Sequence, residues 1–321
     1  MDFIIIGAGN IGQKHADILG QLKQSVVAVG DPNLPDEMIE EKLGADGILL
    51  PAVRAYSNPE ECIRTEAKDR AVIIASPSKH HGAQALAAID NGCRALLIEK
   101  PMTILPNEAK EVADACKTYG IKAAVGHNFR FHKAYSEHIS KTKRGLFPFL
   151  VWTASDAVKI WPSWQKPDSY LRDPENGGIL YSAASHCVDL AIALNGPVEA
   201  VLCKIHGDLD GPEQTALIRL VHRAVGNSTI FLTWSDRRYS VLTYVDTAAT
   251  WAFDMHSELL RPSMEMMHRW QMEAFMRYIS GGERGLLCSP EEGHETVLVL
   301  ASAALSRARN EVVHIEREIA K

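Results

Sequence analysis

The chain has 321 residues, 46% of them hydrophobic and 23% charged, and a net charge of −6 at pH 7. This length exceeds what one hydrophobic core usually supports, so we expect two domains. The acidic balance argues against a protein that neutralises phosphate backbones, and we expect no nucleic-acid partner.

The sequence also bears on compartment and metal content. The N-terminal run MDFIIIGAGNIG lacks the basic region and cleavage site of a signal peptide, and no apolar run is long enough to span a membrane. The six cysteines form no C-x-x-C pair, which is typical of buried free thiols in a reducing compartment. The histidines show no H-E-x-x-H spacing, so we name no metal. We therefore expect a cytoplasmic protein without a membrane partner.

Residues 1–125 alternate short apolar runs with helical patterns. The apolar runs lack polar alternation, which is typical of a parallel sheet covered by helices on both faces. This pattern predicts a doubly wound α/β domain. Strands are expected over residues 3–6, 26–29, 72–75, 96–98 and 122–125, and helices over 11–22, 35–43, 59–66, 81–91 and 106–119.

The alternation ends near residue 125, so we expect a second, α+β domain over 126–321. Four or so apolar runs after residue 198 predict a mostly antiparallel open sheet, with a turn signal at residues 225–228. We leave open whether the C-terminal helices pack back on the first domain. Helices are expected over 131–143, 177–195, 264–279 and 291–309.

A glycine-rich run directly follows the first strand and opens the first helix. Gly7 permits a tight turn, Gly9 lets the backbone approach a pyrophosphate, and Gly12 allows close packing of helix and strand. The helix N-terminus offers unpaired N–H groups to phosphate oxygens. The run predicts the phosphate loop of an NAD(P)-binding Rossmann domain, and the alternative is a glycine turn without a ligand. The expected cofactor residues here are Gly7, Gly9, Asn10, Ile11 and Gly12.

Asp31 ends the second strand, about twenty residues after the glycines, where the dinucleotide fingerprint has an acidic residue. A carboxylate there accepts hydrogen bonds from the adenosine ribose and repels a 2′-phosphate. Pro32 and Asn33 follow it, not Arg or Lys, so the sequence favours NAD over NADP. The alternative is that Asp31 only caps a loop.

Two further expected strands end in polar motifs: the strand over 72–75 is followed by Ser76-Pro77, and the strand over 96–98 by Glu99-Lys100-Pro101. Ligands of open α/β sheets bind at the carboxyl ends of the strands. A lysine desolvated beside a cofactor lowers its pKa and can transfer protons, which favours a functional role for Lys100. The alternatives are a surface ion pair of Glu99 with Lys100, and a helix-capping role for His81. The candidate cofactor residues are Ser76, Pro77, His81, Glu99, Lys100 and Pro101.

Five motifs together resemble the glucose–fructose oxidoreductase, inositol dehydrogenase and MocA (Gfo/Idh/MocA) family. They are the glycine loop, Ser-Pro with a histidine downstream, Glu-Lys-Pro, GHNFRF, and the run GGILYSAASHCVDLAIALNG, with Gly-Gly followed by His-x-x-Asp. The resemblance runs from residue 1 nearly to the end of the chain. It implies an NAD(P)-dependent oxidoreductase that moves a hydride between the nicotinamide and a secondary alcohol of a sugar, nucleotide-linked sugar or related polyol. It also implies a homodimer or homotetramer formed through the open sheet.

The resemblance further assigns residue roles. Lys100 is implied to be the catalytic lysine, and His186 to face it across the cleft as the second acid/base group. Glu99 is implied to help hold the nicotinamide ribose, and Asn128 and Arg130 to border the substrate.

One position departs from the family pattern. Ser182 stands four residues before His186, where sugar and inositol dehydrogenases of this family commonly have Asp. Serine orients an imidazole but supplies no charge to stabilise imidazolium, which puts a three-residue relay and inositol-like substrates in doubt. Asp189, one helical turn beyond His186, is either the missing orienter or a structural residue.

A proline-containing stretch between the two domain motifs is rich in aromatic residues. Trp161 and Trp164 lie near Tyr170 and Arg172 in it, and aromatic faces stack on sugar rings while Arg binds carboxylate or phosphate. We therefore expect Trp164, Tyr170 and Arg172 to bind the substrate, and the alternative is that the tryptophans anchor a long loop.

Two further functions stay open for the protein as a whole. One is a redox-neutral enzyme that uses NAD transiently for elimination, epimerisation or glycoside cleavage, and the other is a non-enzymatic sensor of NAD or sugar.

Overall fold

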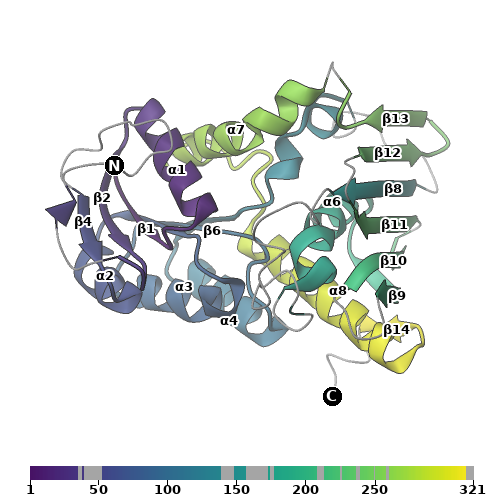
Figure 1. Ribbon diagram of the computed structural model, residues 1–321, viewed down its shortest axis with the longest axis horizontal. Coiled ribbons are helices and arrows are strands. Elements are labelled where there is room, and N and C mark those ends of the chain that lie inside the picture. Colours follow the sequence, from purple (N-terminus) through teal and green to yellow (C-terminus); the bar gives the residue numbers. More distant parts are fainter. Residues whose placement is uncertain are drawn as a thin grey trace. The chain divides into compact units, whose positions relative to one another are not determined.

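The computed structural model, drawn in Figure 1, describes most of the chain. The chain forms two compact units. Unit 1 comprises Met1–His127 and His268–His294, and unit 2 comprises Asn128–Met267 and Glu295–Lys321. The described residues are 1–34, 38–39, 53–138, 148–156, 173, 177–207, 213–224, 226–235, 239–248, 250–257 and 260–315.

Unit 1 contains a seven-stranded sheet within the described residues, in the order β3-β4-β2-β1-β5-β6-β7. Its strands pair in parallel except β3 with β4. β5 and β6 are fully buried, because helices cover both faces: α1 lies on one face and α2, α3 and α4 on the other (Figure 1). The doubly wound fold is thus confirmed. The strands are β1 (Asp2–Ile6), β2 (Ser25–Gly30), β3 (Met38–Ile39), β4 (Val53–Tyr56), β5 (Ala71–Ile74), β6 (Ala95–Ile98) and β7 (Lys122–Val125); the helices are α1 (Asn10–Gln21), α2 (Pro59–Glu66), α3 (His81–Asp90) and α4 (Pro106–Thr118).

Local sequence signals set several helix ends in unit 1. The Asn58 side chain accepts hydrogen bonds from the backbone N–H groups of Glu60 and Glu61, and so caps α2. Gly92 and Gly120 follow α3 and α4 with φ of 74° and 66°, in the left-handed region that favours glycine.

One predicted helix in unit 1 is wrong where the structure describes it. Residues 38–39, inside the helix expected over 35–43, form β3, which pairs antiparallel with the unexpected β4. Both strands are short, and only β3 lies at the sheet edge, since β4 pairs with β3 on one side and β2 on the other. Backbone pairing therefore decides their conformation, and the periodicity of apolar residues does not reveal it. The other residues of the expected helix, 35–37 and 40–43, lie outside the described residues.

Unit 2 also contains a seven-stranded sheet in its described part, in the order β13-β12-β8-β11-β10-β9-β14. β8 pairs in parallel with β11, and the other neighbours are antiparallel. The expected mostly antiparallel sheet is confirmed. Its strands are β8 (Phe149–Asp156), β9 (Val198–Gly207), β10 (Glu213–His222), β11 (Asn227–Trp234), β12 (Tyr239–Val245), β13 (Thr250–Asp254) and β14 (Val313–His314).

Three helices complete the described part of the fold: α6 (Ser185–Asn195), α7 (Arg261–Ile279) and α8 (Pro290–Arg309). α6 continues a π-turn over Leu180–Ala184, within the helix expected over 177–195. Within the helix expected over 131–143, the structure has a π-helix over Ala134–His138, preceded by a 3-10 turn over Asn128–Phe131. The remaining residues of that expected helix lie outside the described ranges.

The described helices include none with the length and apolarity needed to cross a membrane. All six cysteines are buried free thiols, as their spacing predicts.

Candidate functional site

The glycine loop of unit 1 folds tightly on itself. A Cβ added at Gly12 would lie 1.9 Å from the Gly7 carbonyl oxygen, and one at Gly7 would lie 2.6 Å from the backbone of Ala75 and Ser76. Gly7 also has φ of 102°, which disfavours any other residue. A Cβ at Gly9, by contrast, meets no atom of the described residues within 4 Å. The backbone at Gly9, the N-cap of α1, is therefore open to a ligand.

Asp31 ties the end of β2 to this loop. Its Oδ2 accepts a hydrogen bond from the Ala8 backbone N–H at 2.8 Å, and its Oδ1 accepts one from the Asn33 N–H at 2.9 Å. The carboxylate thus caps the loop and lies next to the start of α1.

His81 joins the exits of β5 and β6. Its ring is 1% exposed, with Nε2 2.8 Å from the Ser76 carbonyl oxygen and Nδ1 2.9 Å from that of Pro101. Burial lowers the pKa of His81. Ser76 Oγ donates to Gln84 at 2.6 Å, and Pro77 precedes a short 3-10 turn. These contacts fix two loops at the carboxyl end of the sheet.

The carboxylate of Glu99 points into the core of unit 1. It is 7% exposed, and its Oε1 lies 2.7 Å from Nε2 of the fully buried His15. Burial would raise the pKa of Glu99, but the hydrogen bond from His15 and the favourable electrostatic interactions of the carboxylate with His15, His268 and Lys100 hold it at about 2. Glu99 is therefore ionised at neutral pH.

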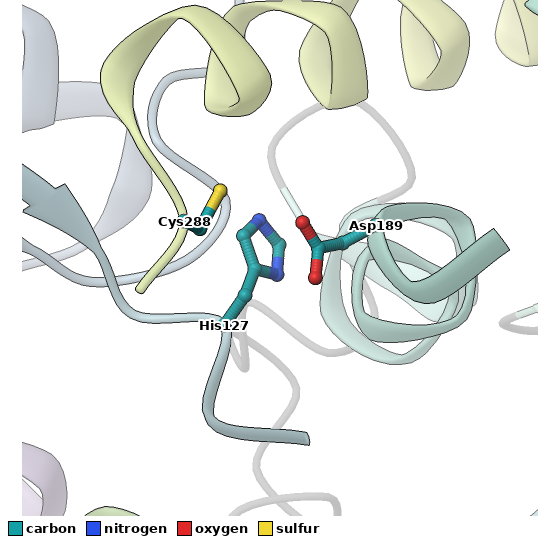
Figure 2. A group of neighbouring side chains, drawn as sticks. All are labelled: His127, Asp189 and Cys288. Carbon is teal, nitrogen blue, oxygen red and sulfur yellow. The ribbon is translucent and has the colours of Figure 1, made fainter. Parts of the chain in front are cut away.

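Lys100 follows Glu99 and is half-buried, and its peptide bond to Pro101 is cis. On the side of β7, the imidazole of His127 and the thiol of Cys288 lie within 4.8 Å of each other (Figure 2). The Val125 N–H donates to the Cys288 carbonyl at 2.9 Å, which attaches the segment His268–His294 to the sheet of unit 1.

In unit 2, the structure brings two predicted residues together. Arg130 lies in the turn Asn128–Phe131, and its guanidinium binds the carboxylate of Asp189 on α6 through two hydrogen bonds. Figure 2 draws this aspartate on its helix. Asn128, which begins the turn, is also buried. Both oxygens of Asp189 are thus engaged by Arg130.

His186 lies on the same helix and is half-buried. Its ring packs on Phe129 at 4.7 Å between centroids, and Phe129 packs on Trp152 at 5.5 Å. Trp152 Nε1 donates to Ser240 Oγ at 2.7 Å, so the aromatic stack is anchored to the sheet. Ser182, in the π-turn before α6, is half-buried as well.

Sequence reasoning missed His15 and His268. His15 is on the face of α1 that also buries Ala16 and Leu19, so a polar residue within that apolar stripe was the available signal. Trp161, Trp164, Tyr170 and Arg172 lie outside the described residues.

Comparisons with known proteins agree with this geometry. Residues 1–127 match the oxidoreductase family with an NAD-binding Rossmann fold. The chain is 29% identical to scyllo-inositol 2-dehydrogenase (NAD(+)) of Bacillus subtilis over 195 residues, 60% of this chain and 53% of that protein. The chain thus spans about half the length of the curated relatives it matches.

Solved structures extend the likeness in fold to both units. A probable dehydrogenase from Thermotoga maritima superposes with a TM-score of 0.79 at 20% identity, covering 99% of each chain. Levoglucosan dehydrogenase in complex with NADH gives a TM-score of 0.80 at 17% identity, covering 98% of this chain and 99% of that one. The glycine loop, the Glu99–Lys100 motif and the family match lead to one conclusion: residues 1–127 belong to the Gfo/Idh/MocA oxidoreductase family, as its NAD-binding Rossmann domain.

Proposed function

We propose that the protein is an NAD-dependent dehydrogenase that oxidises a secondary alcohol of a sugar, nucleotide-linked sugar or related polyol. The observation that carries the proposal is the pairing, in one unit, of an open backbone at Gly9 with Lys100 at the carboxyl end of β6. Ligands of such sheets bind at the carboxyl ends of the strands. The names of relatives, an NAD-dependent inositol dehydrogenase and a levoglucosan dehydrogenase, support the substrate class.

The residues of the loop fit a dinucleotide. Gly7 and Gly12 have no room for a side chain, while Gly9 leaves its backbone clear where a pyrophosphate would approach. The unpaired N–H groups at the start of α1 would bind its oxygens. The carboxylate of Asp31, which accepts the Ala8 N–H, would also accept hydrogen bonds from the adenosine ribose and would repel a 2′-phosphate, which supports NAD over NADP.

In the proposed reaction, the alcohol carbon loses a hydride, its oxygen loses a proton, and a C=O double bond forms. NAD, when bound, supplies the acceptor for the hydride. Lys100 in its neutral form takes the proton at Nζ, and His186 is the second acid/base group. A positioned acid or base typically contributes about 10²–10⁴-fold to the rate. Ser182, at the position where the family commonly has Asp, supplies no negative charge to His186.

The experiment follows the absorbance of reduced nicotinamide. Protein with and without added NAD is mixed with scyllo-inositol, levoglucosan, glucose 6-phosphate and UDP-glucose, with Lys100→Ala as the inactive variant. We expect NADH to form in the wild type alone, while Lys100→Ala still binds NADH by fluorescence. NADH binding without absorbance change on any sugar would reject the dehydrogenase and favour the redox-neutral or sensing alternatives.

We also propose that the protein is a homodimer or homotetramer formed through the sheet of unit 2. Val241, Thr153 and Phe231 form one row across β12, β8 and β11, and the row belongs to an exposed apolar face. Exposed patches of this kind mark interaction surfaces. The large apolar side chains of this face, 36–44% exposed, are Phe149, Val221, Phe231, Tyr239, Val241 and Val245.

Light scattering tests the assembly. Phe231→Glu should reduce the molar mass to that of a monomer, whereas Leu105→Glu, at an exposed leucine of unit 1, should not. A wild-type monomer would reject the proposal.

A further inference from the structure

The Glu99 carboxylate is held from three sides within unit 1. Its Oε1 lies 2.7 Å from His15 Nε2, and its Oε2 accepts the backbone N–H of Lys100 at 3.2 Å. On a third side, a Cβ added at Gly126 would lie 2.8 Å from the carboxylate carbon. The carboxylate therefore has one orientation, next to the backbone of Lys100.

This carboxylate is ionised although it is buried. The pKa of Glu99 is about 2, and burial lowers the pKa of His268 to about 3, so His268 is neutral at pH 7. Replacing buried ions with apolar groups is often neutral or stabilising, so a buried charge is poorly explained by stability alone. Perturbed ionisable groups cluster at functional sites. The titratable or charged groups that face Glu99 and His268 are Lys14 and His15 on α1, Lys100, His81 on α3, and each other.

His15 connects this carboxylate to the glycine loop. It is fully buried on α1, three residues after Gly12, in the helix that Gly9 caps. The centroid of the His268 ring lies 6.3 Å from that of His15, and the two rings meet edge to face. One hydrogen bond thus links the helix that would bind the pyrophosphate to the residue that precedes Lys100.

We propose that His15 is a positioning residue: its hydrogen bond holds the Glu99 carboxylate beside Lys100, and the fixed negative charge sets the pH at which the Lys100 amine releases its proton. The inference rests on the proposed function, in which Lys100 accepts the proton of the alcohol. A negative charge near an ammonium group favours the protonated form. Without His15, the carboxylate loses its donor and either turns away or takes up a proton, and Lys100 then releases its proton at lower pH.

The test measures the pH at which the Lys100 amine loses its proton, and it requires no turnover. Acetic anhydride acetylates only neutral amines, so the acetylation of Lys100, followed by peptide mass spectrometry across pH, gives the midpoint of its deprotonation. Glu99→Gln should lower this midpoint by about 1 pH unit, and His15→Leu should lower it similarly. The double variant should show no further shift, because both changes remove the same interaction.

Two variants control for structural effects. In His15→Gln the glutamine amide still donates a hydrogen bond to the Glu99 carboxylate, so the midpoint of Lys100 deprotonation should match that of the wild type. Glu66→Gln neutralises a carboxylate that is also 7% exposed in unit 1 but is bound by Arg54 and Arg70, and its midpoint should not move.

An unchanged midpoint in Glu99→Gln overturns the proposal, as does an equal shift in Glu66→Gln. If circular dichroism shows that His15→Leu does not fold, His15→Gln and Glu99→Gln decide: the proposal stands only if the former keeps the midpoint and the latter lowers it. A shifted midpoint in a protein that reduces no NAD would retain the positioning role and reject the proposed reaction. An unshifted midpoint in an active dehydrogenase would do the reverse.

Discussion

Arg130 and Asp189 form a buried, two-pronged ion pair inside unit 2. Nε of Arg130 donates to Oδ2 of Asp189 at 2.9 Å, and an Nη atom donates to Oδ1 at 2.7 Å, with the side chains 5% and 1% exposed. Such parallel hydrogen bonds are strong and directional. The pair joins the turn Asn128–Phe131 to α6, the helix that carries His186.

Breaking this pair from one side should be costly. Asp189→Leu leaves the Arg130 charge buried without its carboxylate, and we expect the free energy of unfolding to fall by about 3–5 kcal/mol. The double variant Arg130→Met/Asp189→Leu should recover most of this loss, because no unpaired charge remains. Urea unfolding followed by circular dichroism measures both. A double variant as unstable as the single one would show that the uncompensated charge is not the cause.

Gly9 and Gly12 should respond differently to the same substitution. Gly12→Ala places a methyl group 1.9 Å from the Gly7 carbonyl oxygen, so it should lower both the melting temperature and NADH affinity. Gly9→Ala meets no atom of the described residues within 4 Å and should keep the melting temperature while weakening NADH binding. Thermal unfolding and NADH fluorescence titration separate the two effects. Unaltered NADH affinity in Gly9→Ala would place the dinucleotide elsewhere.

Asp31 should decide between the two dinucleotides. Asp31→Ser removes the charge that repels a 2′-phosphate, so NADPH affinity should rise relative to NADH. NADH affinity itself should fall about tenfold or more, since hydrogen bonds to a charged group are lost. Fluorescence titration with each dinucleotide gives the ratio, and Asp90→Ser, at an exposed position at the end of α3, serves as the matched control. An unchanged ratio would contradict the ribose assignment.

His132 should make unit 2 sensitive to acid. Burial lowers the pKa of His132 from 6.5 to about 4. Between these values the unfolded chain binds a proton that the folded chain does not, so stability falls as pH decreases from 6.5 to 4, by up to about 1.4 kcal/mol per pH unit. In His132→Leu the free energy of unfolding should depend less steeply on pH over this interval. Equal slopes in the two proteins would mean that His132 titrates normally when folded.

The sequence predicts an element correctly where the pattern of its own residues is enough to define it. The apolar runs of β1, β5 and β6 have no polar alternation because both faces are covered, and that signal is local. β8 escaped notice because it depends on pairing with distant strands: it lies between β11 and β12, which follow it by many residues. β3 escaped notice because its two residues are too few to show a pattern.

The same distinction applies to the candidate site. The glycine loop and the Glu99-Lys100-Pro101 motif can be predicted from the sequence because their residues are adjacent in the chain. The contact of His15 with Glu99 joins residues 84 positions apart, and that of Arg130 with Asp189 joins residues 59 apart. Composition and spacing carry no trace of which buried polar side chains will meet, so both contacts had to come from the structure.

The division of the chain has a consequence for biosynthesis and engineering. Unit 1 needs His268–His294, which supplies His268 and the Cys288 backbone that pairs with Val125, yet this segment follows the whole of Asn128–Met267. A ribosome therefore completes the polypeptide of the second unit almost entirely before the first can close its fold. A fragment ending at residue 127 would lack that last piece, so swapping this unit as a cassette into another scaffold requires three junctions, at residues 127, 267 and 294, and not one.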